Sequence, residues 1–184
     1  MAPSDHETDN LLATLATRRA FLRGSAEGLS DEQARATPTV SSLSIGGIVK
    51  HVTATERQWA SFVQHGAPRD VPDYFIDFDE LDWSDPAGIP AWVLARQEEL
   101  THREDETLVD LLDDYSACAQ ETETVVRDLP DLAVVHDLPP APWNEPGGSM
   151  SARQVLAHLI GETAQHAGHA DIIRETIDGR RAMG

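Results

Sequence analysis

The stretch SARQVLAHLIGETAQHAGHADIIRETIDG, from Ser151 to Gly179, decides the fold of this chain. At about 100° per residue its apolar side chains recur on one narrow arc, which is the pattern of a helix packed against a core. Four polar side chains fall within about 80° of one another on the same face: His158, Glu162, His166 and His169. The helix therefore carries polar groups where a core is normally apolar.

A carboxylate and imidazoles cannot enter an apolar seam unpaired without a large free-energy cost, so the seam must supply hydrogen-bond partners, water or a cation. Glu162 and His166 stand one helical turn apart and can reach one point, as ligand pairs do in helix bundles. A third ligand is needed from another helix. His51, in SIGGIVKHVTATERQWASFV, is the candidate because it also shares an arc with apolar residues. The spacing predicts either a metal site or a hydrogen-bonded buried cluster.

The early helix reads H-x4-E from His51 and the late helix reads E-x3-H-x-G-H-A-D from Glu162. This pairing resembles the DinB-like superfamily of metal-dependent four-helix proteins, and within it the branch of mycothiol-dependent S-transferases and maleylpyruvate isomerases. The segment LSDEQARATP, residues 29–38, supports the match. The resemblance implies that His51, Glu162 and His166 hold a divalent metal. Zinc is the first candidate, and Ni²⁺, Fe²⁺ and Mn²⁺ are alternatives.

The same resemblance implies an S-transferase that activates a low-molecular-weight thiol, mycothiol or a counterpart, as a metal-bound thiolate for attack on an electrophilic small molecule. His169 is the candidate for a proton relay. Three aromatic side chains from long connections are candidates for holding the substrates: Tyr74, Trp83 and Trp143. A thiol-dependent cis–trans isomerase, a metal-dependent hydrolase and a non-catalytic metal-binding bundle are the alternatives. Relatives are often dimers, which makes a homodimer a candidate assembly.

Three further segments have the apolar spacing of long helices, at about residues 9–28, 44–65 and 107–128. Shorter helical segments are expected at 30–36 and 91–102. The connections 67–90 and 129–149 are rich in proline and too long for simple bundle loops. No strand pattern stands out. The prediction is an all-α, DinB-like four-helix bundle with long crossover connections, as one domain over residues 1–184 with a frayed start at 1–8.

Composition limits the possible partners. The chain has 32 acidic and 14 basic residues, a net charge of −18, which disfavours nucleic acid and anionic membranes as partners. Cys118 is the single cysteine, so an intrachain disulfide is impossible, and its helical position predicts a core residue. With no long apolar run, we expect a cytoplasmic protein. Glu56 is predicted to be a salt-bridged surface group, and His102 carries no functional signal.

Overall fold

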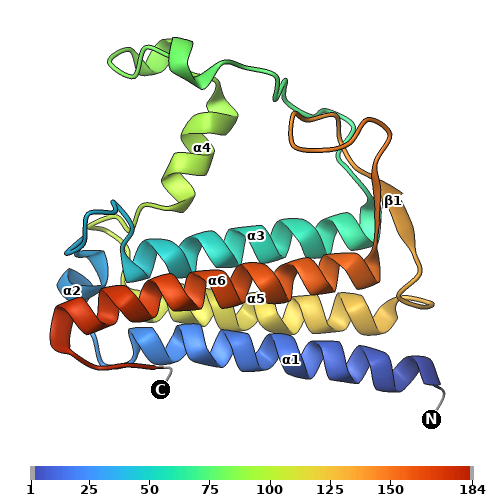
Figure 1. Ribbon diagram of the computed structural model, residues 1–184, viewed down its shortest axis with the longest axis horizontal. Helices are drawn as coiled ribbons and strands as arrows, with labels where there is room; N and C mark the ends of the chain where they lie inside the picture. The colour runs from blue at the N-terminus through green and yellow to red at the C-terminus, as the bar shows by residue number, and fades with distance from the viewer. Residues whose placement is uncertain (1–2, 183–184) are drawn as a thin grey trace.

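Four long helices form the body of the computed structural model, which describes residues 3–182. They lie side by side, while a shorter helix and two long connections extend to one side of the bundle (Figure 1). In chain order the elements are α1 Pro3–Ala26, α2 Asp31–Arg35, α3 Ile45–His65, the 3-10 helices η1 Phe78–Glu80 and η2 Pro86–Gly88, α4 Ala91–Glu99, α5 Leu108–Asp128, β1 Val135–Asp137, β2 Ser149–Ser151 and α6 Ala152–Asp178. The all-α fold class expected from the sequence is confirmed.

Side-chain caps set the beginnings of the helices. Ser151 and Gln154 form a capping box at the start of α6, so the first free amides of that helix are satisfied by side chains. Ser44 caps α3 by accepting a hydrogen bond from the amide of Gly47 at 3.1 Å. Gly179 ends α6 in the left-handed conformation, with φ of 77°. These are the helix limits that the sequence predicts for α3 and α6.

The first helix begins earlier than the sequence suggests. The apolar spacing starts near Asp9, but α1 already begins at Pro3. Two ion pairs hold this early turn region against other helices: Glu7 with Arg153 at 2.6 Å, and Asp9 with Arg127 at 2.8 Å. Polar tertiary contacts therefore extend a helix whose first residues lack an apolar pattern. Of the start expected to be frayed, residues 1 and 2 lie outside the described part of the chain.

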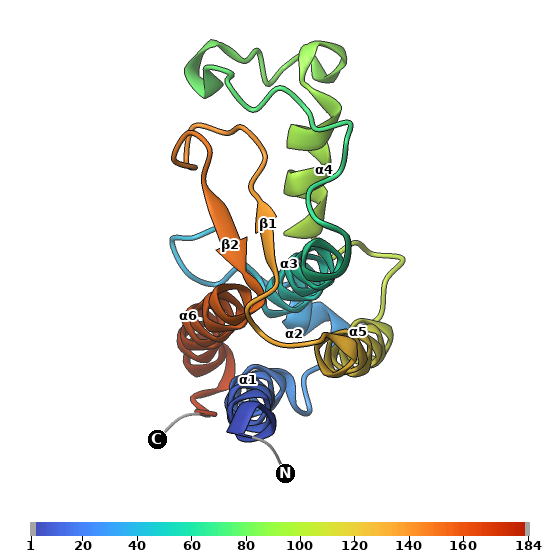
Figure 2. The ribbon, with the colours of Figure 1, turned by 90° about the vertical axis from the view of Figure 1, so that its right-hand side faces the viewer.

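The bundle is assembled with α1 packed along α6, and with α3 packed against both α5 and α6, as the end-on view shows (Figure 2). Its interior holds two apolar clusters. One includes Leu22, Ile48 and Ile173, and the other includes Leu15, Val63 and Leu156. Between these clusters lies a set of buried polar side chains: Arg19, Glu56, Thr122 and Thr163. The middle of the bundle is thus more polar than either end.

A short two-stranded sheet was not expected from the sequence. β1 and β2 pair antiparallel, with His136 opposite Met150. Strands of three residues are too short for alternating hydrophobicity to reveal them. The pairing closes the connection between α5 and α6 into a hairpin, while the connection after α3 crosses above the bundle to α4 (Figure 1). Within the described residues, every helix is too short or too polar to cross a membrane.

Candidate metal centre

The predicted ligands from α3 and α6 converge. Nε2 of His51 lies 3.5 Å from Oε1 of Glu162, and Nε2 of His166 lies 3.3 Å from the same oxygen. The three donor atoms lie within 4.8 Å of one another, and among the described residues they form the one such group of histidine, cysteine and carboxylate side chains. His51 is buried, whereas Glu162 and His166 are partly exposed. The cluster is therefore reachable from outside the bundle.

The spacing of these donors fits a cation. Zinc takes imidazole nitrogens and carboxylate oxygens at about 2.0–2.2 Å, so neighbouring donors around a tetrahedral ion stand about 3.4 Å apart. The two separations that involve Glu162, 3.5 and 3.3 Å, are close to this edge length, and the two histidine donors lie within 4.8 Å of each other. Two imidazoles and one carboxylate also leave coordination positions open, as catalytic sites require. The residues present therefore suit a divalent metal with room for a small ligand.

Electrostatics favour neutral imidazole at this place. Burial lowers the pKa of His166 below its ordinary value, and nearby His51 lowers it further, while Glu162 opposes both effects. A neutral ring offers a lone pair from Nε2, which is the form that binds metals. The rings of His51 and His166 meet edge to face with centroids 4.8 Å apart. The two imidazoles are thus arranged around one carboxylate.

The other two histidines of the same arc take different positions. His169 is partly buried, its ring centroid lies 5.5 Å from that of His166, and its Nδ1 has no hydrogen-bond partner. His158 is exposed and packs against Trp59, with ring centroids 5.0 Å apart. Neither belongs to the three-donor group. His169 is therefore beside the cluster, and His158 is a surface residue of α6.

Comparison with known proteins identifies the family. The sequence profile described as Mycothiol-S-transferase matches residues 10–179, which is nearly the whole chain. The chain belongs to the mycothiol S-transferase family. The resemblance inferred from the H-x4-E and E-x3-H segments is thereby confirmed. A crystal structure titled as the conserved protein of a locus from Enterococcus faecalis has the same fold, with a TM-score of 0.62, 16% identity, and 98% of this chain and 99% of that chain covered. No curated protein matches the sequence.

This member of the mycothiol S-transferase family has a further carboxylate near the cluster that the sequence analysis missed. Oε2 of Glu99, the last residue of α4, lies 3.8 Å from Nδ1 of His51. Burial raises the pKa of Glu99, but neighbouring His51 and Arg96 outweigh that effect and hold the pKa below its ordinary value. Its sequence neighbourhood shows no sign of this contact. The available signal was the pair Gly46 and Gly47, because adjacent glycines within a helix indicate close packing.

The aromatic residues expected to hold the substrates are only partly brought together. The ring of Tyr74 lies 5.2 Å from that of Trp143 and 5.2 Å from that of Trp92 on α4. Phe78 joins them through Trp92, at 5.9 Å. Trp83 is 51% exposed and belongs to no ring pair among the described residues. In this mycothiol S-transferase family member, the aromatic cluster of Tyr74, Trp92 and Trp143 therefore contains two of the three predicted residues, and Phe78 packs beside it.

Three expectations about other polar residues have different outcomes. Cys118 is fully buried in the bundle and burial raises the pKa of its thiol to about 12, so it is the predicted core residue. Glu56 is ion-paired as expected, but the pair with Arg19 is buried and not at the surface. His102 is also buried, against Gly46 at the start of α3. The surface position expected for Glu56 was wrong because helical angle alone does not show which neighbours cover a side chain. The burial of His102 does not test the expectation that it carries no functional signal.

Proposed function

We propose that this chain is a metal-dependent S-transferase that joins a low-molecular-weight thiol, mycothiol in the first instance, to an electrophilic small molecule. The observation that carries this proposal is the convergence of His51, Glu162 and His166 from two helices onto one point. The family supports the choice of thiol and the reaction class. The open coordination positions left by three ligands support a small ligand over a purely structural ion.

In this proposal His51, Glu162 and His166 hold a divalent cation, with zinc as first candidate. When bound, the cation would offer a position to the thiol sulfur and favour loss of its proton. The two helices keep the donors in place without moving, because α3 and α6 pack directly against each other. The partial exposure of Glu162 and His166 leaves the side toward solvent free for the incoming thiol.

The chemical step needs an acceptor for the thiol proton. We assign this role to His169, because its ring adjoins that of His166 and the residue is only partly buried. The S–H bond breaks and the proton passes to the imidazole. The sulfur then forms a bond to the electrophilic carbon, and the leaving group departs with its bonding electrons. Cys118 takes no part, because its buried thiol with a pKa of about 12 is not a nucleophile at neutral pH.

The second substrate is assigned to the aromatic cluster of Tyr74, Trp92 and Trp143. Trp92 lies on α4, Tyr74 packs against Trp92, and Trp143 packs against Tyr74; the last residue of α4 lies beside His51. Exposed faces of aromatic rings bind flat apolar molecules well. Trp143 is 63% exposed and offers such a face. Trp83 lies outside this cluster, so the proposal does not rely on it.

The test supplies the purified protein with mycothiol and a reactive aryl halide, with and without a chelator, and follows conjugate formation. We expect conjugation that needs both thiol and metal, and that is abolished in His166→Ala. His158→Ala is the matched control, since His158 lies on the same helix outside the donor group, and it should retain activity. His169→Ala should keep its metal and lose about 100-fold or more in turnover, as removal of a proton acceptor typically causes.

Other outcomes point to the other functions. Turnover of the electrophile in the absence of thiol indicates a hydrolase that uses water at the open position. A protein that binds its metal fully and conjugates no thiol is a binding bundle, and the proposed transfer reaction is then wrong.

A further inference from the structure

The two nitrogens of the His51 ring have different surroundings. Nε2 faces Glu162 within the donor group, at 3.5 Å. Nδ1 is buried and has no hydrogen-bond partner within bonding distance, and the carboxylate that it faces belongs to Glu99, at 3.8 Å. A buried polar atom without a partner is uncommon in proteins. The ring is therefore placed between two carboxylates, one on each side.

Glu99 is not a fourth member of the donor group. That group contains His51, Glu162 and His166 alone, and Glu99 lies on the opposite nitrogen of the His51 ring. Its side chain is 32% exposed and is held by Arg96, one turn earlier on α4, at 2.8 Å. This pair restrains the carboxylate at the end of α4 that faces His51. Glu99 can thus act on a metal through the imidazole and not by direct contact.

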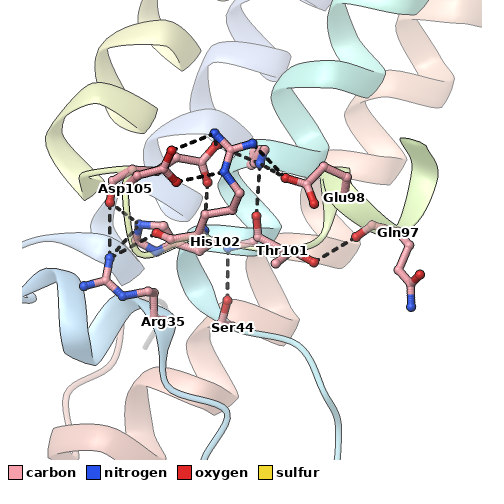
Figure 3. A network of polar contacts seen from close by, with 11 residues as sticks. Arg35, Ser44, Gln97, Glu98, Thr101, His102 and Asp105 are labelled. Carbon is pink, nitrogen blue, oxygen red and sulfur yellow. Dashed lines mark hydrogen bonds and ion pairs between the residues drawn. The ribbon is translucent and has the colours of Figure 1, made fainter. Parts of the chain in front are cut away.

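The backbone next to Glu99 is fixed to the first turns of α3. The carbonyl of Leu100 lies so close to Gly47 that a Cβ there would overlap it, and the His102 ring occupies the equivalent space over Gly46. Nζ of Lys50 donates to the carbonyl of Thr101 at 3.1 Å. Figure 3 shows this crossing, with Thr101 and His102 among the polar contacts above Ser44.

This anchorage explains why Glu99 is beside His51. Gly47 and His51 are one turn apart on the same face of α3. Because the backbone of Leu100 contacts Gly47, the preceding residue, Glu99, lies over the next turn, where His51 is. Two glycines without side chains make this approach possible. The position of the Glu99 carboxylate therefore follows from the contact between the backbones of Leu100 and Gly47.

From this geometry we infer that Glu99 is the positioning residue for the metal ligand His51. A shift of the Glu99 side chain that closes the 3.8 Å gap would let its carboxylate accept the Nδ1–H of the ring, which keeps the Nε2 lone pair directed at Glu162 and His166. Carboxylates behind metal-binding histidines fix the tautomer and the ring orientation in this way. The inference rests on the metal site of the proposed function. It adds that α4, which also carries Trp92 of the aromatic cluster, is coupled to the metal centre through Glu99.

The test measures zinc affinity by competition with a chromophoric chelator. Glu99→Ala should weaken zinc binding by about 10–100-fold, the usual effect of removing such a partner. Glu99→Gln keeps an oxygen acceptor for Nδ1–H, so it should lose less affinity than Glu99→Ala. Glu98→Gln is the matched control: Glu98 precedes Glu99 but pairs with Lys50 and Arg103. It should bind zinc as the wild type does.

A second measurement separates positioning from general structure. In the zinc-loaded wild type and in Glu98→Gln, nitrogen-15 NMR should show His51 protonated on Nδ1 with a slowly exchanging proton. In Glu99→Ala that proton should exchange fast while the helix content stays unchanged.

Equal zinc affinity for Glu99→Ala and wild type overturns the inference and leaves the metal site intact. Failure of the wild type to bind any divalent metal overturns the metal site and the inference together. Tight metal binding that depends on Glu99, in a protein that transfers no thiol, supports the inference while contradicting the proposed reaction.

Discussion

Arg19 of α1 and Glu56 of α3 form an ion pair in the middle of the bundle, where Arg19 is 8% exposed and Glu56 is fully buried. Nε of Arg19 donates to Oε2 of Glu56 at 3.0 Å, and its Nη2 donates to Oε1. The paired groups lie between the two apolar clusters. This two-point contact specifies how α1 is placed along α3, because sliding either helix would leave a charge unpaired.

Glu56→Ala should lower the free energy of unfolding by about 3–5 kcal/mol, since it leaves the Arg19 guanidinium buried without its partner. Urea denaturation measures the change. The double variant Arg19→Met/Glu56→Leu removes both charges and should recover most of the loss. A double variant as unstable as Glu56→Ala would contradict this explanation. Zinc binding should be the same in all folded variants, because the pair is not part of the donor group.

The glycine pair of α3 offers a second test of stability. Gly47→Ala would place a methyl group against the carbonyl of Leu100, and backbone cannot move aside easily. We expect the free energy of unfolding to fall by about 1–3 kcal/mol, which is typical of overpacking. Gly161→Ala on α6 is the matched control, since a Cβ there meets nothing within 4 Å. Its free energy of unfolding should rise by about 0.5–1 kcal/mol, because alanine has a higher helix propensity than glycine. Thermal unfolding of both variants gives the comparison.

The outcome at Gly46 distinguishes backbone from side-chain crowding. Gly46→Ala overlaps the His102 ring, so the double variant Gly46→Ala/His102→Ala should be more stable than Gly46→Ala alone. The same His102 replacement should not rescue Gly47→Ala. If the His102 replacement stabilised both variants, the segment from Leu100 to His102 would have moved away from α3, and crowding by the ring would not be the cause at Gly46.

The helical period together with the family resemblance was sufficient to predict the donor group. The period places His51, Glu162 and His166 on arcs shared with apolar residues, and the resemblance selects them over His158 and His169 of the same arc. Neither was sufficient for Glu99. That residue lies on a short helix whose place is set by the crossing over Gly46 and Gly47, and sequence spacing does not encode which helix a loop crosses.

The other errors have the same physical origin. Glu56 lies at the edge of the apolar stripe of α3, and angle alone places it at the surface; in the structure α1 covers that edge and supplies Arg19. The strands β1 and β2 form because the two ends of one connection meet, not because of local alternation. Long elements with periodic faces were predictable, whereas contacts that depend on how the elements pack were not.

The buried thiol gives a prediction for alkaline conditions. Burial raises the pKa of Cys118 from about 9 to about 12, so the folded protein keeps the thiol protonated where the unfolded chain ionises it. The contribution of this thiol to the free energy of unfolding is fully present below pH 9 and is lost as the pH rises toward 12. Burial also raises the pKa of Tyr115, which acts in the same direction. Urea titration at several pH values measures the free energy of unfolding. Between pH 8 and 10 it should fall less for Cys118→Ala than for the wild type.

The same residue should be unreactive at neutral pH. At pH 8 about one Cys118 thiol in ten thousand is ionised at a pKa near 12, and Sγ is fully buried. A thiol reagent should label the folded protein far more slowly than the urea-unfolded protein. Rapid labelling of the folded protein would mean that α5 opens locally and exposes this position.

The donor group predicts a stability that depends on metal. A ligand that binds the folded state alone raises the free energy of unfolding by about 2.7 kcal/mol at one hundred times its dissociation constant. Saturating zinc should therefore raise the melting temperature of the wild type and of His158→Ala, because His158 is exposed and packs on Trp59. It should have no effect on His166→Ala, in which two donors remain. The apolar clusters do not include His166, so the helicity of that variant should stay near that of the wild type. Zinc stabilisation of His166→Ala, or its loss in His158→Ala, would show that the metal is held by other histidines than the three that converge here.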